Sequence, residues 1–286
     1  MSFGGVSDVT ARPVAERWAE GLRPRVLSAL VLVAVALVAL EGGALAFDVV
    51  TAVGAAVLAW EWTRLCGGGR FGWTGLVQAA AVVAVIAASC LVSPVAGVAL
   101  IAAGVVGDYI AARVSHRAHP RWIAAGIAYI GLPCIALVWL RGSGAEGKGL
   151  MWWLLLSVWA TDTGAYFVGR AVGGPRLAPR ISPKKTWAGL IGGMACAAAV
   201  GAVVGMLDNG APPPGTLALA SALLAVAAQA GDLAKSVVKR RFGVKDASQL
   251  IPGHGGLLDR VDGVMSAAVV LALWQWSTDG AILAWK

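Results

Sequence analysis

Long apolar runs, each close to 20 residues, recur along almost the whole chain and leave no polar stretch large enough for a soluble domain. An α-helix needs about 20 mainly apolar residues to cross a bilayer. Hydrophobic residues make up 58% of the 286 residues and charged residues only 13%, which is typical of a polytopic membrane protein. The unbroken Ala, Val and Leu runs exclude a transmembrane β-barrel, because barrel strands alternate in polarity. The sequence therefore predicts an all-α, polytopic integral membrane protein.

About nine transmembrane helices are expected, although the first two candidates are separated only by Glu41-Gly42-Gly43, so a count of eight stays open. The chain divides into three predicted regions. These are a cytoplasmic polar N-terminal extension (1–25), an N-terminal region of about five helices (26–149) and a C-terminal catalytic region (150–286) with cytoplasmic polar loops at 169–186 and 232–263. The predicted spans lie near 26–41, 44–62, 74–92, 94–112, 122–140, 150–168, 187–206, 215–231 and 264–283.

Basic residues alternate between connections in a way that predicts the topology. All but three of the 23 Lys and Arg residues fall in every second connection, and only Arg141, Lys148 and Lys286 fall on the other side. The positive-inside rule then places the N-terminus and both long polar loops in the cytoplasm. The net charge of +8 is thus a topology signal, and no nucleic-acid partner is expected.

The segment ISPKKTWAG, residues 181–189, is the first candidate for chemistry. Ser182 is a good helix N-cap and Pro183 suits the first helical position, which predicts Lys184 and Lys185 in the first turn. Cations are disfavoured there by the helix dipole, so we favour a phosphate site that supplies a neutralising anion. The alternative is a positive-inside anchor for the seventh span.

The segment AGDLAKSVVKRR, residues 230–241, continues the eighth span as a helix. One face of that helix carries Asp232, Lys235, Ser236, Lys239 and Arg240, which follow the helical spacing. An amphipathic helix lying on anionic lipid would explain the cations. It would not explain Asp232, since an acid at the end of an apolar run needs a partner or a metal ion.

Glycines open the last polar segment, HGGLLDRVDG, residues 254–263. Pro252, Gly253, Gly255 and Gly256 disfavour a regular helix and let backbone N–H groups turn toward an anion. For His254 two roles stay open, a donor to phosphate or a hydrogen bond that fixes the loop.

Acids follow these glycines directly. Asp259 and Asp262 are three residues apart at the start of the last span, so both face one side, and Arg260 between them can reach a phosphate. An ion-paired loop is the simpler alternative, but acids, arginine and glycines beside a cationic helix favour a metal–phosphate site. Asp162 near the cytoplasmic end of the sixth span is either functional or paired with a nearby lysine. Glu61 and Asp108 are expected to be simple span-end or interhelical acids.

The segment SVVKRRFGVKDASQLIPGHGGLLDRVD, residues 236–262, resembles the signature of the phosphatidate cytidylyltransferases, also called CDP-diacylglycerol synthases. TDTGAYFVGR and SPKKTWAG also resemble that family, and the likeness covers 150–286 strongly. The signature positions that match are Ser236, Lys239, Arg240, Lys245, Asp246, Ser248, Pro252, His254, Gly255, Gly256, Asp259, Arg260 and Asp262.

The resemblance implies a homodimeric enzyme of the inner (plasma) membrane. Such an enzyme makes CDP-diacylglycerol and pyrophosphate from CTP and phosphatidic acid, with Mg²⁺ in two divalent sites, and K⁺ in one of them is left open. The implied catalytic residues are Asp232, Asp259, Lys239 and Arg260, and the implied metal ligands are Asp232 and Asp259, followed by Asp162 and Asp262. The implied substrate-binding residues are Ser182, Lys184, Lys185, Ser236, Arg240, His254, Gly255 and Gly256.

Two other functions stay open on the sequence. A related CTP-dependent polyprenol or lipid kinase would consume CTP to CDP instead of pyrophosphate. A membrane transporter would need polar residues near the bilayer midplane, whereas the charges here concentrate at the cytoplasmic ends. A CDP-alcohol phosphotransferase is excluded, because Asp262-Gly263 is followed by Val264-Met265-Ser266-Ala267 and not by the spacing of that family.

Overall fold

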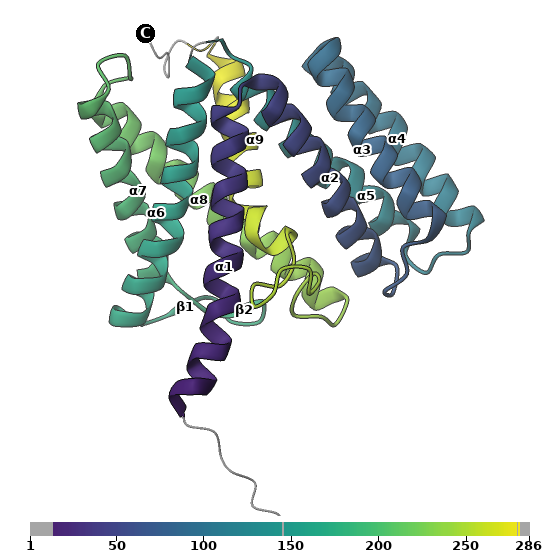
Figure 1. The fold of residues 1–286 in the computed structure, drawn as a ribbon, viewed down its shortest axis with the longest axis horizontal. Coiled ribbons are helices and arrows are strands. Elements are labelled where there is room, and N and C mark those ends of the chain that lie inside the picture. Colours follow the sequence, from purple (N-terminus) through teal and green to yellow (C-terminus); the bar gives the residue numbers. More distant parts are fainter. Residues whose placement is uncertain (1–13, 145, 279, 281–286) are drawn as a thin grey trace, which may run out of the picture.

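A computed structural model of the protein describes residues 14–144, 146–278 and 280, and the side chains from residue 26 onward. This part of the chain forms nine long helices and one short antiparallel hairpin (Figure 1). The elements are α1 (Val14–Glu41), α2 (Ala44–Cys66), α3 (Gly72–Leu91), α4 (Pro94–Val114), α5 (Pro120–Arg141), α6 (Glu146–Val172), β1 (Arg176–Ala178), β2 (Ser182–Thr186), α7 (Trp187–Leu207), α8 (Pro214–Arg241) and α9 (Leu258–Ser277).

The predicted all-α polytopic architecture is confirmed. In the described part of the chain six helices, α2–α5, α7 and α8, are long and apolar enough to cross a membrane. The apolar part of α1 is the shorter stretch Val26–Glu41, and α6 and α9 carry charged residues within their length. The first two predicted spans are separate helices, because the chain turns at Gly43, whose φ of +91° suits glycine.

Several helix ends differ from the predicted ones. The predicted polar extension 1–25 is helical from Val14 onward, and residues 1–13 lie outside the described residues. Helix α8 runs to Arg241, as predicted for 230–241, and α9 already begins at Leu258, so the loop between them covers only 242–257. The predicted end of the last span, near 283, also lies outside the described residues.

The predicted helix start at Ser182 is wrong. Residues 182–186 form β2, which pairs with β1 so that Ser182 lies opposite Ala178 and Thr186 opposite Arg176. Helix α7 starts at Trp187, and its N-cap is Thr186, whose Oγ1 accepts a hydrogen bond of 3.0 Å from the backbone N–H of Gly189. Lys184 and Lys185 therefore lie in a strand, and the dipole argument for an anion beside them does not apply.

Glycine allows α6 and α7, the two helices that the hairpin connects, to pack closely. A Cβ atom at Gly192 would lie 2.4 Å from Cβ of Val168, and one at Gly164 would lie 2.6 Å from Sγ of Cys196. The hairpin and the loop after α8 lie at the end of the bundle where α1 begins (Figure 1). The long polar segments therefore gather at one end, as the alternation of charge predicts.

Candidate active site

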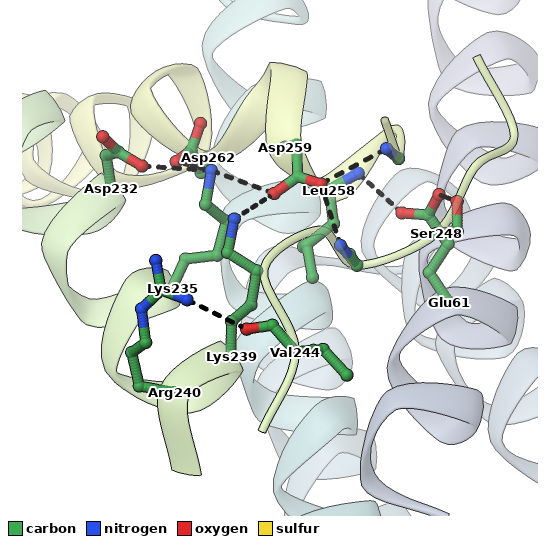
Figure 2. Close-up of polar contacts among 12 residues, drawn as sticks. Glu61, Asp232, Lys235, Lys239, Arg240, Val244, Ser248, Leu258, Asp259 and Asp262 are labelled. Carbon is green, nitrogen blue, oxygen red and sulfur yellow. Dashed lines mark hydrogen bonds and ion pairs between the residues drawn. The ribbon is translucent and has the colours of Figure 1, made fainter. Parts of the chain in front are cut away.

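Lys235 lies at the centre of a cluster of acids at this end of the bundle (Figure 2). Its Nζ atom is 3.1 Å from Oδ1 of Asp232, 3.4 Å from Oδ1 of Asp259 and 2.5 Å from Oδ2 of Asp262. Only 4% of the Lys235 side chain is exposed. Burying an ammonium is costly unless it is paired, so this lysine depends on the carboxylates around it.

Two further lysines balance the charge of the cluster. Lys185 of β2 lies 2.6 Å from Oδ2 of Asp232, and Lys239 of α8 lies 2.6 Å from Oδ1 of Asp259. Three carboxylates therefore face three ammonium groups. We call these six residues the Asp/Lys cluster: Lys185, Asp232, Lys235, Lys239, Asp259 and Asp262.

Helical spacing and one glycine bring these residues together. Asp232, Lys235 and Lys239 lie three and four residues apart on one face of α8, and the two acids of α9 lie three apart in its first turns. A Cβ atom at Gly231 would lie 1.8 Å from Oγ of Ser266, so α8 and α9 approach closely only because this position is glycine. The predicted common face is confirmed for Asp232, Lys235 and Lys239 of α8 and for the two acids of α9, whereas Ser236 and Arg240, predicted on the same face of α8, are not part of the cluster.

Asp259 also holds the loop that precedes it. Its Oδ2 accepts hydrogen bonds from the backbone N–H groups of Ala247, at 2.9 Å, and Gly256, at 3.2 Å. Gly255 has a φ of +81°, and a Cβ atom there would lie 3.2 Å from the same oxygen. The glycines thus turn backbone N–H groups toward an anion as predicted, and that anion is a carboxylate of the protein.

Glu61 of α2 is the main site residue that the sequence analysis missed. Its Oε1 accepts hydrogen bonds from Oγ of Ser248 (2.6 Å) and the N–H of Leu257 (2.8 Å), and its Oε2 accepts one from the N–H of Leu258 (2.7 Å). The Glu61 side chain is fully buried, and these contacts join the N-terminal helices to the start of α9 (Figure 2). We call Glu61 with these three donors the α2 clamp.

Gly256 is required by the α2 clamp. A Cβ atom at this position would lie 2.6 Å from Oε1 of Glu61. The signal for Glu61 was present in the sequence, since a charged residue inside an apolar run needs a partner. That rule singled out Asp232, but its application to Glu61 required knowing that α2 lies against a loop almost 200 residues away.

A pocket of about 210 Å³ opens beside the cluster, between α6, β2, α7 and α8. Asp162 and Asp232 both line it, together with Lys184 and Lys185. Tyr166 and Leu190 provide apolar surface, and Thr186 and Gln229 provide polar groups. The structure therefore brings four of the predicted site residues to one small cavity that combines acids and cations.

The other predicted residues lie around the cluster. The Nδ1 atom of His254 lies at hydrogen-bond distance, 2.7 Å, from Oγ of Ser28 in α1, and this contact favours the loop-fixing role. Arg240 donates from Nε to the carbonyl of Ile181 (3.4 Å) and from Nη1 to that of Val244 (3.5 Å), and so joins the hairpin to the loop after α8. Three more predicted residues remain: Arg260 is exposed on the first turn of α9, Ser236 is half-buried on α8, and Ser182 lies in β2.

The acidic side chains of the site fit a magnesium ion whose coordination shell is completed by substrate oxygens. Within the described residues, no group of three or more His, Cys, Asp or Glu side chains is arranged to hold a metal ion by itself. Mg²⁺ commonly uses only one or two carboxylates together with phosphate oxygens and water. Asp162 and Asp232 line the smaller pocket and supply such carboxylates. The oxygens of Asp232 pair with Lys185 and Lys235, and those of Asp259 with Lys239 and the N–H of Ala247, so an ion at either acid would replace one of these protein groups.

Comparison with known proteins shows the family to which the chain belongs. The sequence pattern of the cytidylyltransferase family matches residues 23–277, which is most of the chain. The chain belongs to the cytidylyltransferase family. It is 39% identical over 270 residues to the phosphatidate cytidylyltransferase of Brucella suis biovar 1 (strain 1330), covering 92% of this chain and 94% of that protein.

Relatives from other bacteria are similar over different lengths. The chain is 38% identical over 272 residues to the phosphatidate cytidylyltransferase of Pseudomonas aeruginosa, covering 90% of this chain and 97% of that protein. It is 41% identical over 139 residues to that of Staphylococcus saprophyticus, covering 49% and 52% of the two chains. Membership of the cytidylyltransferase family identifies this membrane protein as a nucleotidyltransferase and confirms the predicted family resemblance.

Proposed function

We propose that this cytidylyltransferase is a phosphatidate cytidylyltransferase, which converts CTP and phosphatidic acid into CDP-diacylglycerol and pyrophosphate. The observation that carries the proposal is the Asp/Lys cluster beside a small pocket lined by two acids and two lysines, at the polar end of a membrane-spanning bundle. A reaction between a bilayer lipid and an aqueous nucleotide requires a site at this interface. The names of the relatives support the same activity.

The proposed reaction is the attack of a lipid phosphate oxygen on the α-phosphorus of CTP. A bond forms between that oxygen and the α-phosphorus, and the bond from the α-phosphorus to the oxygen that bridges it to the β-phosphorus breaks, so pyrophosphate leaves with its electron pair. The attacking oxygen is already anionic, and a strong base is not required. Catalysis then depends on positioning and on neutralising phosphate charge.

The cations of the site are assigned to two tasks, neutralising substrate phosphate and holding the carboxylates in place. Lys184 and Lys185 line the smaller pocket and would hold a phosphate group there. Lys235 and Lys239 keep the carboxylates of α8 and α9 in place. Arg260 is exposed on the first turn of α9 and is assigned to a substrate phosphate.

Mg²⁺ is proposed as the cofactor, with Asp162 and Asp232 as the carboxylates that would hold it in the smaller pocket. When bound, the ion would neutralise charge on the phosphate oxygens. Asp259 and Asp262 are assigned to the second ion, divalent or K⁺, which would replace the ammonium groups of Lys235 and Lys239 beside them. The oxygen-only donor set supports a hard cation.

The related lipid kinase is the nearest alternative. It would transfer the γ-phosphoryl group of CTP and release CDP, and the Asp/Lys cluster alone does not separate the two reactions. The relatives' names favour cytidylyl transfer. A transporter is disfavoured, because the charged cluster and its pocket lie at one end of the bundle and not at its middle.

The proposed setting is the bacterial inner membrane, with the N-terminus and the Asp/Lys cluster in the cytoplasm. The charge alternation supports this orientation, and the bacterial sources of the relatives support the membrane. A homodimer is proposed from the family resemblance. Chemical cross-linking in native membranes tests it, and a purely monomeric product would contradict it.

Purified protein in detergent, supplied with CTP, phosphatidic acid and Mg²⁺, tests the function. We expect CDP-diacylglycerol and pyrophosphate in equal amounts from the native chain, and loss of both on removal of Mg²⁺ with a chelator. Asp259→Asn removes one charge from the cluster and is expected to abolish turnover, whereas Asp208→Asn, in the turn at the opposite end of the bundle, is expected to keep it. A folded native protein that makes no lipid nucleotide, with or without K⁺, would overturn the proposal.

A further inference from the structure

A second, larger pocket of about 810 Å³ lies at the same end of the bundle. Its walls are the last turns of α2, the turn at 67–69 and the loop 242–250 after α8, and it shares no lining residue with the smaller pocket. Its volume is within the usual range for sites that hold a whole small molecule, about 300–1,000 Å³. The smaller pocket has room for little more than a phosphate group and an ion.

Aromatic and guanidinium surfaces line the larger pocket. Phe242 is fixed by edge contacts with His119 and Trp122, at ring-centre distances of 5.2 Å and 5.7 Å. The guanidinium of Arg64 lies 4.8 Å from the ring centre of Trp60, and its Nε donates to the carbonyl of Gly69 at 3.2 Å. Planar groups held in this way can stack on a nucleobase without first being ordered.

Polar groups of the same pocket suit a cytosine nucleotide. Arg64 and Lys245 supply positive charge for phosphate oxygens. Asp246 can accept from the exocyclic amine of cytosine, and the amide of Gln249 offers both a donor and an acceptor for its ring edge. Lys245, Asp246 and Gln249 lie on the exposed loop after α8, and Arg64 is exposed at the end of α2, so an aqueous ligand has access to all four side chains.

The loop that lines this pocket also holds the Asp/Lys cluster. The N–H of Ala247 donates to Asp259, and the hydroxyl of Ser248 donates to Glu61, while both residues line the pocket. A ligand in the pocket therefore contacts the segment that positions Asp259. The smaller pocket meets the cluster at Asp232 and Lys185 instead, so the two pockets reach the cluster through different residues.

We infer that the larger pocket binds the nucleoside and outer phosphates of CTP, and that the smaller pocket is left for the lipid phosphate. This inference rests on the proposed function. It gives roles in nucleotide binding to Trp60 and Arg64 of α2, which lie outside the signature segment 236–262. It also assigns base recognition to Asp246.

Binding of radiolabelled CTP to the detergent-purified protein in the absence of phosphatidic acid tests the site without turnover. Arg64→Ala and Trp60→Leu are expected to weaken binding about tenfold, in line with the loss of one stacking or phosphate contact. In steady-state assays the KM for CTP should rise by the same factor, while the KM for phosphatidic acid stays within about twofold. Arg70→Ala and Trp73→Leu are matched controls, exposed and outside the pocket, and should bind CTP like the native chain.

The outcomes separate failure of this inference from failure of the proposed function. A rise in the KM for phosphatidic acid alone would assign the larger pocket to the lipid, and unchanged binding and KM values would show that it binds neither substrate. Either result overturns the inference while product formation by the native chain upholds the function. If the native chain instead released CDP, the function would fail, and CTP binding by the variants would still test the pocket.

Base selectivity gives a test that tolerates partial loss of folded protein. The ratio of kcat/KM for CTP to that for UTP is measured within one variant, so the amount of active enzyme cancels. Asp246→Ala is expected to lower this ratio about tenfold, because uracil lacks the exocyclic amine. An unchanged ratio would overturn the role of Asp246 in base recognition.

Discussion

The α2 clamp makes the replacement Glu61→Gln informative, because the two side chains have nearly the same shape. Glutamine can keep its carbonyl oxygen where Oε1 accepts from Ser248 and Leu257. Its amino group then faces the N–H of Leu258, which loses its acceptor at the start of α9. The substitution therefore removes one buried hydrogen bond and one negative charge without creating a cavity.

The expected cost follows from these contacts. Leaving a buried N–H without an acceptor costs about 1–3 kcal/mol. Removing a negative charge from a helix N-terminus costs about 0.3–1 kcal/mol at the surface and up to about 2 kcal/mol when buried. We expect a loss of roughly 2–4 kcal/mol in the free energy of unfolding, which corresponds to a fall in Tm on the order of 5–10 °C.

Two buried cysteines provide the assay. Cys66 is fully buried and Cys134 is 3% exposed, so in a background in which the exposed Cys90 and the half-buried Cys196 are replaced, a thiol-reactive dye reports unfolding in detergent. Glu41→Gln is the control, since Glu41 pairs with Lys148 on the surface with its side chain half exposed, and such pairs contribute about 0–1 kcal/mol. Because the clamp fixes the loop that holds Asp259, Glu61→Gln should also lower kcat. A Glu61→Gln protein with the Tm and kcat of the native chain would refute the clamp.

Three further substitutions test other parts of the structure. Gly256→Ala should lower Tm through a cost of about 1–3 kcal/mol, because the added Cβ meets the α2 clamp, whereas Gly54→Ala in α2, where a Cβ meets nothing within 4 Å, should not. Thr186→Ala should lower the free energy of unfolding by about 1 kcal/mol through loss of the α7 cap, and Ser182→Ala by less than about 0.5 kcal/mol. A larger loss for Ser182→Ala than for Thr186→Ala would show that Ser182 is the cap. Lys235→Met should cost about 3–5 kcal/mol and abolish turnover, because three carboxylates lose their shared cation, and an active variant of native Tm would contradict that role.

The spans and the common faces of the site could be predicted because they depend on local periodicity. Runs of apolar residues define the helices, and the spacing of Asp232, Lys235 and Lys239 places them on one side of α8 without any knowledge of tertiary structure. The same holds for Asp259 and Asp262 at the start of α9.

Contacts between distant segments could not be predicted in the same way. By residue type Ser182 is at least as good an N-cap as Thr186, and only the pairing of β2 with β1 decides that Thr186 caps α7. Glu61 contacts Leu258 across 197 positions in the sequence, and no local pattern reports that contact. The central position of Lys235 among the acids also depends on tertiary structure, because α8 and α9 must first pack closely at Gly231.

The position of the phosphorus label in the product tests the proposed reaction most directly. Purified protein is given phosphatidic acid and Mg²⁺ with CTP labelled either at the α-phosphorus or at the γ-phosphorus. Cytidylyl transfer predicts that the α-label enters the lipid fraction and that the γ-label leaves in pyrophosphate. Appearance of the γ-label in the lipid, with the α-label in free CDP, would contradict the account and identify a lipid kinase.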